Sequence, residues 1–319
     1  MLESLSISSL YSLFTPLFTP IFTSIFTSIF TSIFTPLFTS IFTPLFTPIY
    51  QMHRLLAALS FFTRFPFWKI AKLNKQHYER VVPLWPLTGW LTAASMMLVF
   101  GLSALFLPVN IALVIAILTR LAITGALHED GFADFFDGFG GGKDRNSILR
   151  IMKDSHIGTY GVVALIIYFL LLFLTLQTYF NAMFFNQPTG CFVIQERNCW
   201  TKFIYAAIFF AADPFAKWAS SNIINILPYA RNEEDAKNHL IYNKMTIAEK
   251  LFGLAVGCLP AFFFFNLIIL IPMAVSAATA AVIIFICYKK LNAYTGDCCG
   301  ACFIISELAF YLTALAVLT

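Results

Sequence analysis

The residues of this sequence best suited to chemistry are carboxylates within residues 127–161. This segment holds six of the sixteen acidic residues: Glu129, Asp130, Asp134, Asp137, Asp144 and Asp154. Asp130, Asp134 and Asp137 stand at i, i+4 and i+7, a spacing that on a helix places three carboxylates within about a sixth of the circumference. Because like charges so close repel one another, a cation is needed to neutralise them. Mg²⁺ prefers such oxygen ligands, so the spacing predicts Asp130, Asp134 and Asp137 as its ligands.

Three consecutive glycines, Gly140, Gly141 and Gly142, follow the carboxylates. Glycine lets the backbone approach a ligand closely and turn its N–H groups toward phosphate. We therefore predict that these glycines contact the phosphates of a substrate and that the segment handles a phosphoanhydride with the help of a metal. The alternative is an acidic, solvated loop between two membrane spans. The helical register, the triple glycine and a second cluster at Lys153, Asp154 and Ser155 favour the functional interpretation.

The order of Asp and Gly in this segment resembles the signature of the cobalamin synthase family, the adenosylcobinamide-GDP ribazoletransferases. The matching stretches are Leu127-His-Glu-Asp-Gly-Phe-Ala-Asp-Phe-Phe-Asp-Gly-Phe-Gly-Gly-Gly142 and Met152-Lys-Asp-Ser-His-Ile-Gly-Thr-Tyr-Gly161. Phe61-Phe-Thr-Arg-Phe-Pro66 and Thr295-Gly-Asp-Cys-Cys-Gly-Ala301, followed by Glu307, resemble its first and last motifs. The resemblance covers about residues 52 to 319. The sequence departs from the family at Glu129, where Leu is usual, and at His156, where Arg is usual; losing that Arg removes a bidentate phosphate donor.

The resemblance implies a reaction in which α-ribazole, or its 5′-phosphate, attacks adenosylcobinamide-GDP and GMP leaves. Mg²⁺ on the three aspartates would bridge the pyrophosphate oxygens, and Lys153 would add fixed positive charge. His128 or Asp154 would take the proton of the attacking hydroxyl, and the sequence does not choose between them. Arg231 is a candidate phosphate clamp, because its planar guanidinium can bind phosphate through two donors. Asp297 and Ser155 complete the predicted substrate-binding residues.

The composition predicts an all-α, polytopic membrane protein. Hydrophobic residues make up 59% of the 319 positions, charged residues 11%, and the mean hydropathy is +0.80, whereas soluble proteins carry about 25% charged residues. Apolar runs long enough to cross a bilayer recur. We predict about seven transmembrane helices, at 81–107, 109–127, 157–180, 200–227, 251–271, 273–290 and 302–319. The acidic, glycine-rich stretch would then be an active-site loop between the second and third of these helices.

The basic residues predict the orientation in the membrane. Sixteen of the twenty Lys and Arg residues fall in four predicted loops on one side, at 52–80, 128–156, 228–250 and 289–301. An excess of Lys and Arg marks the cytoplasmic side. The three family-like regions, at 61–66, 127–161 and 295–301, lie on that side, so we expect an inner-membrane protein whose active site faces the cytoplasm.

Residues 1–51 differ from the rest of the chain. Positions 13 to 48 repeat a four-residue unit, Ile/Leu-Phe-Thr-Ser/Pro, too short for a structural repeat and interrupted by prolines that disfavour a helix. We expect a low-complexity extension without chemistry, followed by a single catalytic domain at 52–319; an additional membrane-associated segment is the alternative. Residues 52–80 interleave basic and aromatic side chains, which is typical of an amphipathic segment at a membrane surface.

Polar residues inside the predicted spans are costly and often functional; they are Arg120, Asp213, Lys217 and Glu307. Asp213 and Lys217, four residues apart, are expected to neutralise each other. The basic residues form no stripe that predicts nucleic-acid binding, and a homo-oligomer or association with other cobalamin-assembly enzymes stays open. A secondary transporter or cation channel is the alternative function, although transporter sites usually lie at the bilayer midplane. An enzyme like the CDP-alcohol phosphotransferases, which also use spaced aspartates, is a weaker match.

Overall fold

The computed structural model describes residues 48–185, 199–231, 240–265 and 267–318. The chain divides into two units, Met1–Met52 and His53–Thr319. Residues 1–47 lie outside the described part, so the interpretation of the repeat stays a prediction. In the described part of the second unit every regular element is a helix, and the one β-type contact is an isolated bridge between Tyr229 and Tyr294.

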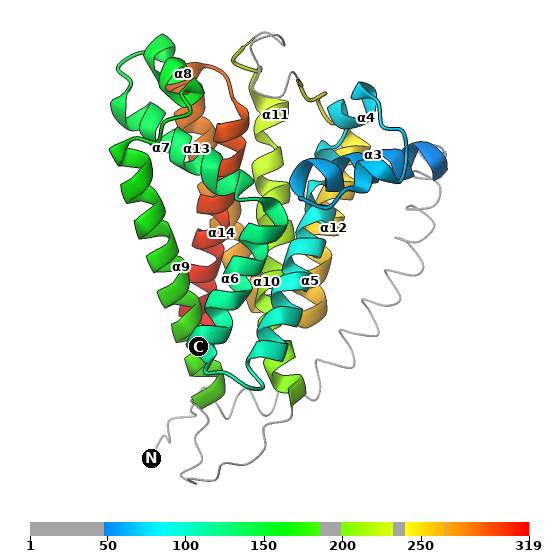
Figure 1. Cartoon of the computed structure of the whole chain (residues 1–319), viewed down its shortest axis with the longest axis vertical. Coiled ribbons are helices and arrows are strands. Elements are labelled where there is room, and N and C mark those ends of the chain that lie inside the picture. Colours follow the sequence, from blue (N-terminus) through cyan, green and yellow to red (C-terminus); the bar gives the residue numbers. More distant parts are fainter. Residues whose placement is uncertain (1–47, 186–198, 232–239, 266, 319) are drawn as a thin grey trace, which may run out of the picture. The chain divides into compact units, whose positions relative to one another are not determined.

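Figure 1 shows the order of the helices along the chain. They are α3 (Pro48–Phe62), α4 (Lys75–Glu79), α5 (Trp85–Ser103), α6 (Val109–Thr124), α7 (Leu127–Gly141), α8 (Arg145–Lys153), α9 (Thr159–Phe185), α10 (Cys199–Ser221), α11 (Ile223–Ile226), α12 (Ile247–Phe264), α13 (Leu270–Leu291) and α14 (Gly296–Leu318). Helix α14 is central: it packs against α7, α9, α10 and α13. Helix α10 packs against α5 and α12 on its other sides.

Four helical segments of the described chain are long and apolar enough to cross a membrane. They are Val82–Ser103, Thr159–Met183, Leu267–Leu291 and Gly296–Leu318, and α6 with α7 would form a fifth as one bent span. The multi-pass character is therefore supported, whereas the number seven is not confirmed. The predicted spans 109–127, 200–227 and 251–271 overlap α6, α10 and α12, none of which is by itself among these four segments. By itself α6 has 16 residues, fewer than the roughly 20 that a span needs.

The predicted active-site stretch at 128–156 is mostly helical, in α7 and α8, and its place as a loop between two spans is not confirmed. Helix α7 leaves α6 at an angle of 87°. Gly125 and Ala126 make this corner with positive φ angles of 64° and 56°, a conformation that ends helices. Asp130, Asp134 and Asp137 therefore lie on a true helix, as their spacing predicted, but that helix turns away from α6.

Buried ion pairs join the helices. The guanidinium of Arg120 on α6 donates to Glu307 of α14 at 2.6 Å, to Glu129 of α7 at 3.2 Å and to the hydroxyl of Tyr168 on α9. Removing one member of such a network leaves an uncompensated buried charge, so this arginine fixes four helices together. Glu129, the departure from the family's usual Leu, is a partner in this network.

A second buried pair confirms the expectation for α10. Lys217 pairs with Asp213, whose carboxylate also accepts a hydrogen bond from the hydroxyl of Thr92 on α5 at 2.6 Å. Helix α5 comes close here because Gly89 has no side chain: a Cβ on it would lie 2.8 Å from Asp213 and from the backbone of Pro214.

Candidate active site

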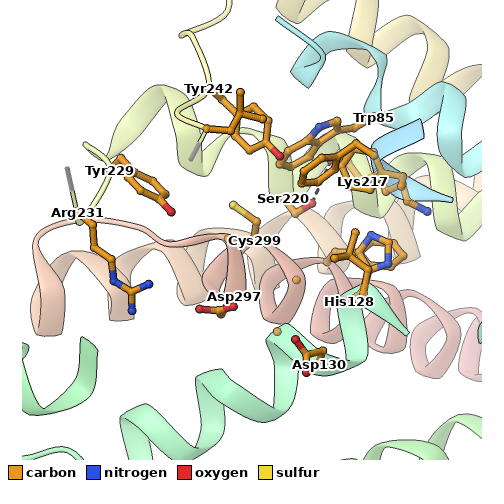
Figure 2. Close-up of a pocket in the computed structure, with 18 residues that line it drawn as sticks. Trp85, His128, Asp130, Lys217, Ser220, Tyr229, Arg231, Tyr242, Asp297 and Cys299 are labelled. Carbon is orange, nitrogen blue, oxygen red and sulfur yellow. Dashed lines mark hydrogen bonds between the residues drawn. The ribbon is translucent and has the colours of Figure 1, made fainter. Parts of the chain in front are cut away.

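A cavity of about 180 Å³ lies where α5, α7, α10 and α14 meet the connections after α11 and before α12. Figure 2 shows an aromatic part, with Trp85 and Tyr242, and a charged part, with Asp130, Asp297 and Arg231. The lining residues are Phe61, Phe62, Trp85, Leu127, His128, Asp130, Gly131, Lys217, Ser220, Tyr229, Arg231, Leu240, Tyr242, Gly296, Asp297, Cys299, Gly300 and Phe303. Four predicted site residues therefore share one cavity: His128, Asp130, Arg231 and Asp297.

Two carboxylates reach the cavity from adjacent helices. Asp130 belongs to the first turn of α7 and is exposed, and Asp297 belongs to the first turn of α14 and is buried. Two glycines bring these helices together. A Cβ on Gly131 would lie 3.0 Å from the Cα of Asp297, and one on Gly300 would lie 3.1 Å from the carbonyl oxygen of His128. Any side chain at either glycine would therefore push the two helices apart.

Arg231 is placed by hydrogen bonds of the preceding residue and of its own guanidinium. The preceding residue, Ala230, donates its N–H to the carbonyl of Tyr294 at 2.8 Å, and Tyr294 donates to Pro228 at 2.9 Å. The guanidinium of Arg145 on α8 donates to the carbonyl of Ala230 at 2.9 Å. Arg231 itself donates from Nη2 to the carbonyl of Leu149 at 2.8 Å. This anchored guanidinium has further N–H donors to offer to a ligand.

His128 is held between aromatic rings. Its imidazole stacks on Phe62 at 5.8 Å between centroids and contacts the ring of Phe303 at 4.6 Å. The ammonium of Lys217 lies 4.4 Å from the centroid of the same Phe303 ring, a cation–π arrangement. His128 is therefore buried and fixed on the cavity wall.

Asp137 has a different environment from Asp130. Its two carboxylate oxygens accept the backbone N–H groups of Gly158 at 2.7 Å and Gly161 at 2.8 Å. These N–H groups belong to the start of α9, where unpaired donors and the helix dipole favour a negative charge. Asp137 is not among the cavity-lining residues; it anchors α9 to α7.

The structure does not gather the predicted aspartate triad into one ligand set. Within the described ranges, no three His, Cys, Asp or Glu side chains are grouped so that they could hold a metal. Asp134, half-buried one turn beyond Asp130, does not line the cavity. The metal assignment to Asp130, Asp134 and Asp137 stays a prediction.

The triple glycine ends α7 and does not line the cavity. A Cβ on Gly140 would lie 2.7 Å from the ring of Tyr160, and one on Gly142 would lie 2.7 Å from the carbonyl oxygen of Gly138. These glycines permit tight packing at the end of α7. Because these glycines do not line the cavity, their predicted contact with phosphate stays a prediction.

The Lys153, Asp154 and Ser155 cluster also lies outside the cavity lining. Lys153 ends α8, and all three residues are exposed. Asp154 accepts hydrogen bonds from the backbone N–H of His156 at 3.0 Å and from its imidazole at 2.7 Å. These bonds lower the pKa of the Asp154 carboxyl. Of the two predicted bases, only His128 lines the cavity.

Sequence reasoning missed most of the aromatic part. Trp85 opens α5, Tyr229 follows α11, and Tyr242 precedes α12. Burial raises the pKa of Tyr242 well above its usual range, so its hydroxyl stays protonated. Aromatic residues scattered through an apolar sequence give no signal that they converge. Lys217 was noted only as a partner of Asp213, although it also reaches the cavity.

Comparisons with known proteins agree with these motifs. The family described as cobalamin-5-phosphate synthase matches residues 54–315. A protein of Shewanella baltica (strain OS185), named adenosylcobinamide-GDP ribazoletransferase, is 31% identical over 262 residues, which are 82% of this chain and 93% of the relative. A protein of the same name from Shewanella sp. (strain W3-18-1) is 30% identical over the same shares. No solved structure matches the chain. With its motifs and nearly its whole helical unit matched, the chain belongs to the cobalamin-5-phosphate synthase family.

Proposed function

We propose that this protein joins α-ribazole, or its 5′-phosphate, to adenosylcobinamide-GDP and releases GMP, which gives adenosylcobalamin or its 5′-phosphate. The names of the relatives support this activity. The observation that carries the proposal is the convergence of Asp130, Asp297 and Arg231 on one cavity. A pair of carboxylates beside an arginine is suited to a substrate with a diphosphate and a hydroxyl nucleophile.

The reaction is a phosphoryl-group substitution. The 3′-hydroxyl oxygen of the ribazole forms a bond to the cobinamide-linked phosphorus, the bond from that phosphorus to the oxygen of GMP breaks, and the hydroxyl proton passes to a base. Such a transfer depends on in-line positioning and on neutralisation of the phosphate charge. Arg231 would bind phosphate oxygens. His128 lies in the same cavity as Asp130 and would accept the proton.

The carboxylates also fit a magnesium ion. Mg²⁺ usually takes one or two carboxylates and completes its shell with waters and substrate phosphates. Asp130 and Asp297 provide two carboxylates at an open cavity, and we propose that they hold the ion, with Asp134 one helical turn away from Asp130. When bound, Mg²⁺ would supply positive charge that offsets the charge of the diphosphate.

The test is release of GMP by the purified full chain in detergent. We expect GMP to appear from adenosylcobinamide-GDP only when ribazole or its 5′-phosphate and Mg²⁺ are both present, with one corrinoid product formed per GMP. Addition of a chelator should stop the release, and restored Mg²⁺ should recover it. GMP release that does not need ribazole would indicate a hydrolase and contradict the proposal, as would the complete absence of release.

A further inference from the structure

The aromatic part of the cavity is a preassembled slot. Phe62 meets Trp85 edge-on at 5.4 Å between centroids, and Trp85 meets Tyr242 edge-on at 5.7 Å. Phe61 contacts both Phe62 and Tyr242, at 5.0 and 6.0 Å. Because these rings hold one another in place, the slot keeps its shape without a ligand. Rings arranged in this way bind flat aromatic groups by stacking and edge contacts.

A buried hydrogen-bond donor in this slot has no partner. Trp85 is 4% exposed, and its indole N–H finds no acceptor within the described structure. Burying such a donor without an acceptor is costly. Trp90, one turn further along α5, differs: its indole N–H donates to the carbonyl of Val256 at 3.0 Å. The unpaired N–H on a cavity-lining tryptophan points to a ligand that brings an acceptor.

The other polar groups near the slot have partners or act as donors. The ammonium of Lys217 pairs with Asp213 and contacts the hydroxyl of Thr92 at 3.3 Å. The hydroxyl of Ser220 donates to the carbonyl of Lys217 at 3.1 Å. The lining carboxylates, Asp130 and Asp297, lie away from Trp85 and Tyr242 (Figure 2). The unpaired indole N–H of Trp85 therefore suits a base that brings an acceptor.

The cavity is also small. At about 180 Å³ it is below the roughly 300–1,000 Å³ of pockets that enclose a whole drug-sized ligand. It has room for one flat ring system and part of a sugar, not for a corrinoid. The base of ribazole, a benzimidazole with one ring nitrogen bonded to ribose, has no N–H and keeps one acceptor nitrogen.

From these observations, and resting on the proposed function, we propose that the slot of Phe62, Trp85 and Tyr242 binds the benzimidazole base of the nucleophilic substrate. Trp85 Nε1 donates to the free ring nitrogen of the base. The ribose then extends toward Asp130 and Asp297, and the guanosine part of the other substrate lies outside the slot. Trp85 thus selects the nucleophile by its base.

The test compares Trp85→Phe with the matched control Trp90→Phe in the purified full chain. Trp85→Phe keeps an aromatic ring and removes the N–H. We expect its KM and its calorimetric Kd for α-ribazole to rise about five- to tenfold, the range for one lost hydrogen bond. Its KM for adenosylcobinamide-GDP and its affinity for GMP should stay unchanged. Trp90→Phe should leave the affinities for both substrates unchanged.

A ligand change tests the same bond in the unaltered protein. In an indole riboside that carries the same ring substituents as α-ribazole, a C–H replaces the acceptor nitrogen of the base. We expect the wild-type chain to bind this analogue about five- to tenfold more weakly than α-ribazole, and Trp85→Phe to bind both compounds equally.

Two results would overturn the assignment. One is a loss confined to GMP and adenosylcobinamide-GDP, which would place guanine in the slot; the other is equal binding of α-ribazole and the indole analogue by the wild-type chain. Because binding of α-ribazole is measured without turnover, it tests the slot assignment separately from the proposed reaction. If α-ribazole binds in a Trp85-dependent way and no GMP is released, the proposed function fails and the slot assignment stands.

Discussion

Asp130 and Asp297 stand far apart in the sequence and meet in the cavity because α7 and α14 pack so closely. We expect Asp130→Asn and Asp297→Asn each to lower GMP release by about a hundredfold or more, as for other groups that stabilise charge in a transition state. Each variant keeps the size of the side chain and removes its charge. The measurement is the initial rate of GMP release over a range of Mg²⁺ concentrations.

Asp144→Asn is the matched control for these variants. Asp144 caps α8 by accepting the N–H of Ser147 at 2.8 Å, and asparagine caps helices about as well as aspartate. The control should keep the wild-type rate. Wild-type rates in Asp130→Asn and Asp297→Asn would show that the cavity carboxylates do not take part in the reaction.

Asp137 should behave differently, because its carboxylate accepts two backbone N–H groups at the start of α9. We expect Asp137→Ala to lower the free energy of unfolding by about 2 kcal/mol, the range for hydrogen bonds to a charged group. Thermal unfolding of the detergent-solubilised chain measures this loss. The Mg²⁺ concentration for half-maximal activity should not change; a large increase with unaltered stability would favour the predicted metal role of Asp137.

At the scale of the helix, the position of the site depends on the contact of α7 with α14. Gly131→Ala and Gly300→Ala each introduce a Cβ that would lie 3.0 to 3.1 Å from backbone atoms of the other helix. The helices must separate to accept it, and a small displacement of catalytic groups can cost about a hundredfold in rate. We expect GMP release to fall strongly while circular dichroism reports unchanged helix content.

The control for this pair is a substitution on α7 that meets no backbone. A Cβ on Gly141 would have only an ordinary contact, 3.4 Å from Ile151. Full activity in Gly141→Ala would agree with a packing role for the triple glycine. A large loss of activity there would instead support the predicted contact of these glycines with phosphate.

The helices also show how far the sequence could predict the site. The spacing of Asp130, Asp134 and Asp137 predicted a helical stripe, and the motif around Asp297 predicted a second acidic position. The corner at Ala126 was not predictable, because alanine is a good helix former and rarely adopts a positive φ. The roles of the carboxylates could not be separated either: only the fold shows that Asp137 caps α9 while Asp130 faces a cavity.

The aromatic slot could not be predicted from the sequence for a related reason. Trp85 begins α5 and Tyr242 lies between α11 and α12, so their contact depends on how α5 and α12 pack together. Periodicity describes one helix at a time, so it cannot show which side chains of separate helices share a cavity. The unpaired indole N–H of Trp85 becomes visible only when its surroundings are known.

At the scale of the whole membrane domain, the cavity lies toward one end of the bundle. The first turn of α14 lines it, as do Tyr229 and Arg231 just after α11. These cavity-side segments belong to the predicted loops rich in Lys and Arg. The bias of basic residues supports a cytoplasmic position for them, where nucleotide substrates are available.

This orientation predicts where the end of α14 must lie. The helix has 23 residues, Gly296–Leu318, and a rise of about 1.5 Å per residue carries it across a hydrocarbon core of about 30 Å. If its first turn is cytoplasmic, its last turn is on the other side. We therefore expect alkaline phosphatase fused to the C-terminus to be active and green fluorescent protein fused there to be dark. Fusions made after Asn292, which directly follows α13, should show the opposite pattern. Fluorescence from the C-terminal fusion would place the cavity on the outer face, where the proposed reaction would lack its nucleotide substrate.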